Sequence, residues 1–210
     1  MVKVGINGFG RIGRLILRAL LENYKGKIQV VGINDLGSIE ANAHLIKFDS
    51  THGTLIHDVK LINGGFQIGD QNIKVFAERD PAKLPWGKIG ADVVLECTGF
   101  FLDKASAGKH IEAGAKKVII SAPAKEVDFT VVQGVNSKEL KKQHNIISNG
   151  SCTTNCLAPV AMVLENSFGI EYGDMTTIHS YTGDQKLLDT LHKDLRRARS
   201  TEGAMIPTST

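Results

Sequence analysis

Two cysteines that lie four residues apart are the groups in this sequence best suited to covalent chemistry. Residues 149–160 read NGSCTTNCLAPV, so Cys152 and Cys156 stand among small hydroxyl and amide residues. A tetrahedral metal site needs four ligands, usually with a second pair at matching spacing, and Cys97 is the only other cysteine. A disulfide between helix positions i and i+4 has too large a Cβ separation. We therefore predict no metal site and no disulfide here.

The two cysteines differ in their place on a helix predicted from Cys152 to about Phe168. Cys152 would lie at the helix N-terminus, where backbone N–H groups and the helix dipole favour a thiolate. Cys156 lies one turn further in, beside Leu157 and Ala158, where we expect a small buried thiol. Cys152 is thus the candidate nucleophile, although its position alone leaves a purely structural role open.

A nucleophilic thiol also needs a base that is close in space. Four of the seven histidines have charged neighbours in helical or loop stretches, which predicts solvated positions: His44, His110, His144 and His192. His52 and His57 flank a turn and stay ambiguous. His179 lies among hydroxyl residues in a strand predicted over 170–182. The residues alone do not bring His179 to Cys152, and a core or edge histidine is the alternative.

A glycine-rich turn indicates a nucleotide site near the start of the chain. Gly8, Gly10 and Gly13 form G-x-G-x-x-G between a predicted strand, 2–7, and a predicted helix, 11–23. The first glycine permits the tight turn, the second lets the backbone approach a pyrophosphate, and the third lets helix and strand pack closely. The helix N-terminus then offers N–H groups to the phosphates.

An acid follows where such a site needs one. Asp35 comes directly after a second predicted strand, 28–34, about 20 residues beyond the turn, where a carboxylate binds a ribose 2′-hydroxyl. Its charge would repel a 2′-phosphate, so we predict NAD rather than NADP as the cofactor. The alternative is that the glycines serve only helix–sheet packing and that Asp35 is a turn residue.

The wider pattern predicts an α/β protein with a Rossmann-type doubly wound, mostly parallel sheet. Further strands are predicted over 91–99, 116–121 and 145–149, further helices from Ser38 to about Phe48 and from Asp103 to about Ala113, and an antiparallel excursion over 57–76. The pattern changes after Gly150. We therefore expect a dinucleotide-binding domain over 1–150 and the beginning of an α+β catalytic domain over 151–210.

Composition restricts the partners and the location. The formal charge of +3 over 210 residues is small, and the basic clusters are short and scattered, which argues against nucleic-acid binding. No apolar run approaches the ~20 residues that span a bilayer, and nothing near the start resembles a signal peptide. Three cysteines without a secretion signal fit a reducing compartment. We expect a cytoplasmic protein with no nucleic-acid or membrane partner.

Five motifs together resemble the phosphorylating glyceraldehyde-3-phosphate dehydrogenases of bacterial type. They are GINGFGRIGR (5–14), ECTGFF (96–101), SAPAK (121–125), SNGSCTTNCLAP (148–159) and HSYTGDQ (179–185), in the order of that family. The resemblance implies an NAD-dependent glycolytic enzyme that converts a phosphorylated aldehyde and inorganic phosphate to an acyl phosphate through a cysteine thioester. It also implies a homotetramer in which residues 183–203 lie at a subunit interface.

The same resemblance implies roles for individual residues. Cys152 is the catalytic thiolate and His179 its partner. The positions that match cofactor contacts are Arg11 and Ile12 at the pyrophosphate, with Arg79, Thr98 and Ser121 at the adenine and nicotinamide ends. The positions that match phosphate contacts are Ser151, Thr153 and Thr210 for the attacking phosphate and Thr182 for the substrate phosphate.

The resemblance leaves two alternatives. The chain stops at Thr210, within what resembles IPTSTG, whereas the family continues, so we expect an incomplete catalytic domain. A fragment that binds NAD without catalysis is therefore one alternative. The other is erythrose-4-phosphate dehydrogenase, which is similar to the same family.

Overall fold

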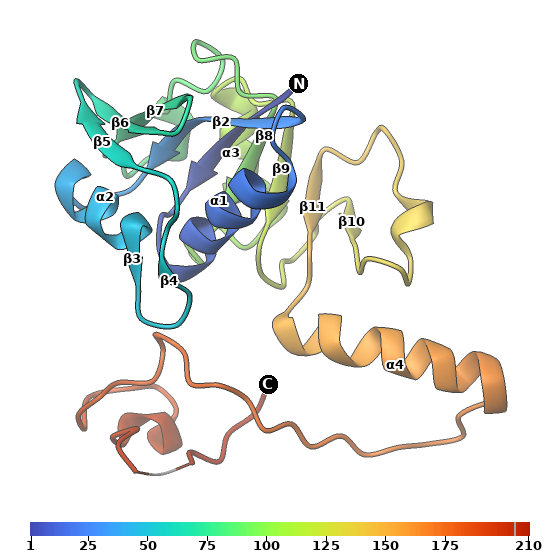
Figure 1. Ribbon diagram of the computed structural model, residues 1–210. Coiled ribbons are helices and arrows are strands. Elements are labelled where there is room, and N and C mark those ends of the chain that lie inside the picture. The colour runs from blue at the N-terminus through green and yellow to red at the C-terminus, as the bar shows by residue number, and fades with distance from the viewer. Residues whose placement is uncertain (204) are drawn as a thin grey trace. The chain divides into compact units, whose positions relative to one another are not determined.

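The computed structural model describes residues 1–203 and 205–210 (Figure 1). The chain divides into two compact units, Met1–Pro159 and Val160–Thr210. Within the described residues, no helix combines the length and the apolar character needed to cross a membrane.

The first unit is built on a nine-stranded sheet with the order β10-β11-β9-β8-β1-β2-β7-β6-β5. Its strands are β1 (Val2–Asn7), β2 (Ile28–Asn34), β5 (Val59–Ile62), β6 (Gly65–Ile68), β7 (Gln71–Phe76), β8 (Val93–Glu96), β9 (Lys117–Ile120), β10 (Phe129–Thr130) and β11 (Ile146–Ser148). Every pairing is parallel except β5 with β6 and β6 with β7. The predicted α/β class and the antiparallel excursion over 57–76 are confirmed. A two-stranded hairpin, β3 (Phe48–Asp49) with β4 (Gly53–Thr54), stands apart from this sheet.

Helices cover both faces of the sheet. Those of the first unit are α1 (Arg11–Asn23), α2 (Ile39–Lys47), α3 (Lys104–Glu112) and the short η1 (Pro81–Lys83) and η2 (Ser137–Glu139). Figure 1 shows α1 and α2 on one face and α3 on the other. The predicted caps are present, because the side chain of Ser38 accepts from Ala41 N and that of Asp103 from Ser106 N.

The central strand β1 separates two halves of the core. Val4 and Ile6 pack in the cluster that includes Leu17 of α1. Gly5 points to the opposite face, where a Cβ would lie 2.6 Å from a ring carbon of Trp86. The alternation of a strand thus explains why a glycine stands between two large apolar residues. The tryptophan fills the space that a side chain on β1 would occupy.

The predicted strand over 170–182 is wrong. The structure gives these residues no regular secondary structure, and no ladder among the described residues includes them. A strand is stabilised by hydrogen bonds to a neighbouring strand, so an alternating apolar pattern without a partner does not suffice.

The second unit holds the end of helix α4 (Cys152–Phe168) and the short η3 (Leu195–Ala198). Arg197 connects its loops, because its guanidinium contacts Asp184 at 2.7 Å, the Thr208 hydroxyl at 2.9 Å and the carbonyl of Ser209 at 2.9 Å. This contact set explains how a polar, aperiodic stretch is held together locally.

Candidate functional site

The predicted cofactor residues meet at one edge of the sheet. Gly8 follows β1, Asp35 follows β2, Arg79 lies after β7, Thr98 after β8 and Ser121 directly after β9. These five strands are neighbours and parallel, in the order β9-β8-β1-β2-β7, so their carboxyl ends lie side by side. The chain leaves β1 toward β2 and later returns to β8 on the other side of β1. Such a switch point is where doubly wound sheets bind ligands.

The three glycines of the turn differ in what surrounds them. Gly8 has φ +88°, and a Cβ there would lie 2.7 Å from the backbone nitrogen of Thr98. A Cβ on Gly13 would lie 2.3 Å from the carbonyl oxygen of Gly8. Gly10 has an ordinary φ of −71°, and nothing lies within 4 Å of the Cβ it lacks. Packing therefore requires Gly8 and Gly13, whereas Gly10 borders open space that an approaching pyrophosphate can use.

The N-terminus of α1 suits an anion. Gly10 caps the helix without a side-chain hydrogen bond, and the first turn has no acidic residue. Its N–H groups and positive dipole end are thus available to phosphate oxygens. Arg11 and Ile12 are exposed beside it, and the Arg11 guanidinium pairs with Asp49 at 2.6 Å.

Asp35 is oriented by backbone donors. Its Oδ2 accepts from the N–H of Phe9 at 2.9 Å, and its Oδ1 accepts from the N–H of Gly37 at 2.8 Å. The residue is half-buried. Each carboxylate oxygen can accept a further hydrogen bond, which suits it to a ribose hydroxyl.

Two other predicted contacts lie on the far side of β1. Thr98 donates both its N–H, at 2.7 Å, and its hydroxyl to Glu96 Oε1. Ser121 donates its N–H to the carbonyl of Glu96 at 3.0 Å. Cys97 precedes Thr98 in the chain and forms a hydrogen bond with Ser121. Burial raises the pKa of its thiol to about 11, although the hydrogen bond with Ser121 by itself lowers that pKa. The raised pKa favours the protonated thiol at neutral pH, which makes Cys97 a poor candidate for the nucleophile.

The predicted nucleophile begins helix α4. Cys152 is the first residue of the helix and is exposed, while Thr153 next to it is buried. The Ser151 hydroxyl accepts from the N–H of Thr154 at 2.9 Å, so the predicted phosphate ligand also caps the helix. Gly150 makes the turn from β11 into the helix with φ +67°.

The expectation that Cys156 is buried is wrong. It is exposed, as are Leu157 and Val160 on the same helix, with exposed fractions of 41% and 55% for the latter two. Burial depends on what packs against a helix, which neighbouring letters in the sequence do not show.

The remaining predicted residues belong to the second unit. His179 is exposed, and its Nδ1 lies 2.6 Å from the carbonyl oxygen of Ser180, to which it donates. Thr182 is exposed and donates its N–H to Gln185 Oε1 at 2.9 Å. Thr210 is exposed as well. Cys152 lies in the first unit and His179 in the second, so their pairing stays a prediction.

The sequence pattern missed a set of buried polar residues at the same sheet edge. Asn7, Asn34 and Glu96 each end a strand of the parallel sheet and are at most 5% exposed. His110, predicted to be solvated, is fully buried instead, which makes that prediction wrong. The sequence contained a clue to each of these positions. A polar residue ends each of the three apolar strands, and His110 follows the buried Ala107 by three residues, which places both on one face of α3.

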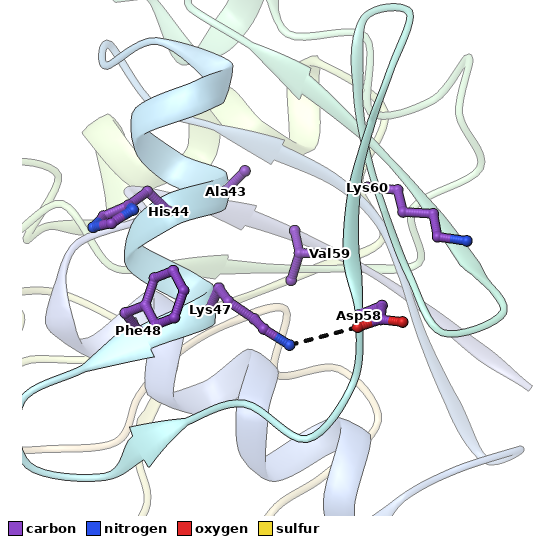
Figure 2. Close-up of a pocket in the computed structure, with 7 residues that line it drawn as sticks. All are labelled: Ala43, His44, Lys47, Phe48, Asp58, Val59 and Lys60. Carbon is purple, nitrogen blue, oxygen red and sulfur yellow. Dashed lines mark ion pairs between the residues drawn. The ribbon is translucent and has the colours of Figure 1, made fainter.

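A separate hollow lies between α2 and β5, away from these residues. Figure 2 shows His44, Lys47 and Phe48 on one side and Asp58 and its neighbours on the other, joined by the Lys47–Asp58 ion pair at 3.7 Å. None of its lining residues is a predicted site residue. Nor do residues 1–203 and 205–210 contain three or more His, Cys, Asp or Glu side chains placed to hold a metal ion.

The fold and this edge define a dinucleotide-binding α/β protein with a thiol at the start of the helix after β11. Residues 2–104 match the family profile described as glyceraldehyde 3-phosphate dehydrogenase, NAD binding domain, and residues 151–210 match the C-terminal domain of the same family. The chain belongs to the glyceraldehyde-3-phosphate dehydrogenase family and carries its NAD binding domain, so NAD is the cofactor of this fold.

Curated relatives agree with that assignment. The chain is 57% identical over 209 residues to glyceraldehyde-3-phosphate dehydrogenase from Xanthobacter flavus. It is 56% identical over 210 residues to glyceraldehyde-3-phosphate dehydrogenase 1 from Bacillus subtilis and to glyceraldehyde-3-phosphate dehydrogenase from Geobacillus stearothermophilus. In each case all of this chain is covered but only 62% of the relative, so the chain spans less than two thirds of their length.

Proposed function

We propose that the protein carries out the NAD-dependent oxidative phosphorylation of D-glyceraldehyde 3-phosphate to 1,3-bisphosphoglycerate, a glycolytic step. The main support is the position of Cys152. It is exposed at the N-terminus of α4, four residues after Ser148, the last residue of β11. Because β11 runs parallel to β9, its carboxyl end lies at the same sheet edge as the cofactor residues.

The first unit would hold NAD along this edge. The N-terminus of α1 receives the pyrophosphate, Asp35 accepts from a ribose hydroxyl, and Thr98 and Ser121 contact the cofactor on the other side of β1. Bound NAD supplies the acceptor for the hydride that leaves the substrate carbon.

The chain itself supplies the covalent chemistry. His179 accepts the proton of the Cys152 thiol. The thiolate attacks the aldehyde carbon, so the C–S bond forms as the carbonyl π bond breaks, and the oxygen takes that proton back from His179 to give a hemithioacetal. His179 takes the hydroxyl proton as that carbon loses its hydride, which leaves a thioester. An oxygen of inorganic phosphate then attacks the thioester, the C–S bond breaks, and the acyl phosphate departs as Cys152 returns to a thiolate.

Hydroxyl groups would hold the two phosphates. Ser151, Thr153 and Thr210 are assigned to the attacking phosphate, and Thr182 to the phosphate of the substrate. A hydroxyl beside a helix N-terminus suits an anion because both present donors. We further propose the division into domains at residue 150, a homotetramer and a cytoplasmic location.

Replacement of the thiol tests the proposal. Cys152→Ala should abolish phosphate-dependent NADH formation, while Cys156→Ala, a matched change one turn along the same exposed helix, should retain it. Unchanged NADH formation in Cys152→Ala would rule out the proposed mechanism. Comparison of kcat/KM for glyceraldehyde 3-phosphate and erythrose 4-phosphate decides the substrate.

A second candidate is that the chain binds NAD without turnover, and the match of residues 2–104 to an NAD binding domain supports it. Calorimetric titration with NAD, followed by an assay under saturating aldehyde and phosphate, separates the two: binding without any NADH formation favours the binding module, and turnover excludes it.

A further inference from the structure

A chain of buried polar side chains joins the strand ends of the cofactor edge. Asn34 Nδ2 donates to Asn7 Oδ1 at 2.7 Å, and Asn7 Nδ2 donates to Glu96 Oε2 at 2.6 Å. Asn34 also binds the backbone of Glu78 twice, accepting from its N–H and donating to its carbonyl, both at 2.8 Å. These bonds connect the ends of β1, β2 and β8 with the segment after β7.

Glu96 is the residue on which most of these bonds converge. Its Oε1 accepts from the N–H and the hydroxyl of Thr98. Its Oε2 accepts from Asn7 and lies 3.0 Å from His110 Nε2. Each of these partners can donate, so both oxygens of Glu96 can act as acceptors. The residue is only 1% exposed.

The protonation of His110 follows from Trp86. The indole nitrogen of Trp86 lies 2.9 Å from His110 Nδ1, and an indole N–H can only donate. Nδ1 must accept, so the ring proton is on Nε2, where it is donated to Glu96. His110 thus connects the indole of Trp86 to the carboxyl group of Glu96.

Four members of the network stand one or two residues before a predicted cofactor contact: Asn7 before Gly8, Asn34 before Asp35, Glu78 before Arg79 and Glu96 before Thr98. We propose that Glu96 is the positioning residue of the NAD site, and that this network sets the relative places of the four loops that border it. The proposal rests on the proposed NAD site and names what holds it in shape.

Glu96→Gln is the sharpest perturbation. The amide has one acceptor oxygen, so its NH₂ must face either the two donors of Thr98 or the donors of Asn7 and His110. If the NH₂ faces Asn7 and His110, two hydrogen bonds are lost. If it faces Thr98, the bond from the Thr98 N–H is lost and the Thr98 hydroxyl must accept instead of donate. The shape of the side chain is retained in both orientations. We expect the Kd for NAD, measured by calorimetry on the purified protein, to rise at least tenfold.

The double variant Asn7→Asp/Glu96→Gln should restore binding. The new carboxylate at position 7 accepts from the new amide at position 96, and it also stands where Asn7 Nδ2 now lies 3.5 Å from His110 Nε2. The amide oxygen can then keep the N–H of Thr98. We expect a Kd within about threefold of the wild type. Such a rescue is not expected if Glu96 only contributes to stability.

Arg18→Met is the matched control. Arg18 is buried and donates to the carbonyls of Ile46, Lys47 and Gly53, which makes it a polar tie of the same unit away from the strand ends. This variant should lose thermal stability and keep its Kd for NAD. If Glu96→Gln does not fold, Asn34→Ser cuts the link to Glu78 and should raise the Kd several-fold.

Amide hydrogen exchange separates this proposal from the proposed NAD binding. The N–H groups of Thr98 and Glu78 donate directly into the network, on opposite sides of β1. Glu96→Gln should speed the exchange of both at least tenfold, with no such change in Arg18→Met. Unchanged exchange at Glu78, or an unchanged Kd in a protein that binds NAD, overturns the proposal. If the wild type binds no NAD, the proposed function fails. The exchange rates of Thr98 and Glu78 then decide by themselves whether Glu96 holds these loops in place.

Discussion

The carboxylate of Asp35 and the backbone N–H of Phe9 are joined by a hydrogen bond of 2.9 Å, which fastens the end of β2 to the glycine-rich turn. The residue predicted to recognise the ribose is therefore also one that shapes the turn for the pyrophosphate. A second bond, from the N–H of Gly37 at 2.8 Å, fixes the other carboxylate oxygen.

Substitutions at Asp35 should separate these two roles. Asp35→Asn keeps an acceptor for Phe9 but removes the charge, so we expect weaker NAD binding and a smaller preference against NADP. Asp35→Ala also loses the tie to the turn and should reduce stability by about 1 kcal/mol. Calorimetric Kd values for both cofactors and denaturant unfolding check this, and an unchanged NAD/NADP ratio in Asp35→Asn would contradict it.

Gly10 and Gly13 provide a matched pair. Gly13→Ala forces a Cβ to 2.3 Å from a backbone oxygen, so stability should fall by about 1–3 kcal/mol. Gly10→Ala meets nothing within 4 Å, so stability should change by less than about 1 kcal/mol, while the Kd for NAD rises at least tenfold. Thermal unfolding and calorimetry give the two readouts. Normal NAD binding by Gly10→Ala would mean that no pyrophosphate approaches there.

Glu126 is strained in a way that a substitution can relieve. Its φ is +54°, and among the described residues it is the one non-glycine residue with a positive φ. The adjoining Lys125 is held by backbone bonds to Leu102 and Lys104, at 2.8 and 3.1 Å, so the segment cannot easily relax. This backbone conformation costs a non-glycine residue roughly 1–2 kcal/mol. Because glycine also increases the entropy of the unfolded chain, Glu126→Gly should raise the free energy of unfolding by only about 0.5–1 kcal/mol. Glu126→Ala keeps the strain and should not stabilise the protein. Equal changes in the free energy of unfolding for the two variants would exclude strain as the cause.

Acid should weaken the protein through Asp128. A hydrogen bond from Lys104, at 2.7 Å, together with the N–H groups of Ile146 and Asn145, lowers the pKa of Asp128 from 3.8 to about 2. A carboxyl group with a lowered folded-state pKa contributes stability above its unfolded pKa and loses it as the pH falls toward 2. The free energy of unfolding should thus drop between pH 5 and 3, and less steeply in Asp128→Asn. Equal slopes would contradict this assignment.

Alkylation should distinguish the cysteines. With a pKa of about 11 and a half-buried position, Cys97 should react with iodoacetamide at pH 8 much more slowly than the other two, until urea unfolds the protein. Cys152 should react faster than Cys156, because both are exposed on one helix and only Cys152 is at its N-terminus. Peptide mass spectrometry measures all three rates. Equal rates for Cys152 and Cys156 would count against an activated thiolate.

Much of the first unit could be predicted because its signals are local. Ser38 and Asp103 cap helices through donors three residues away, and the strands are short apolar runs between turns. The predictions that failed depend instead on which distant residues pack against a segment. Residues 170–182 alternate like a strand but have no partner in the described structure, and charged neighbours hid the inward direction of His110.

The sequence by itself determined the glycine-rich turn, the acid after β2 and the thiol at the start of α4, because backbone sterics, caps and helix dipoles act over a few residues. Only the tertiary structure decided that Asn7, Glu96 and His110 form one buried network. Asn7 and His110 are 103 residues apart, and the strand order together with the packing of α3 against the sheet brings them within 3.5 Å. No periodicity can show such a contact, because it depends on which strands become neighbours.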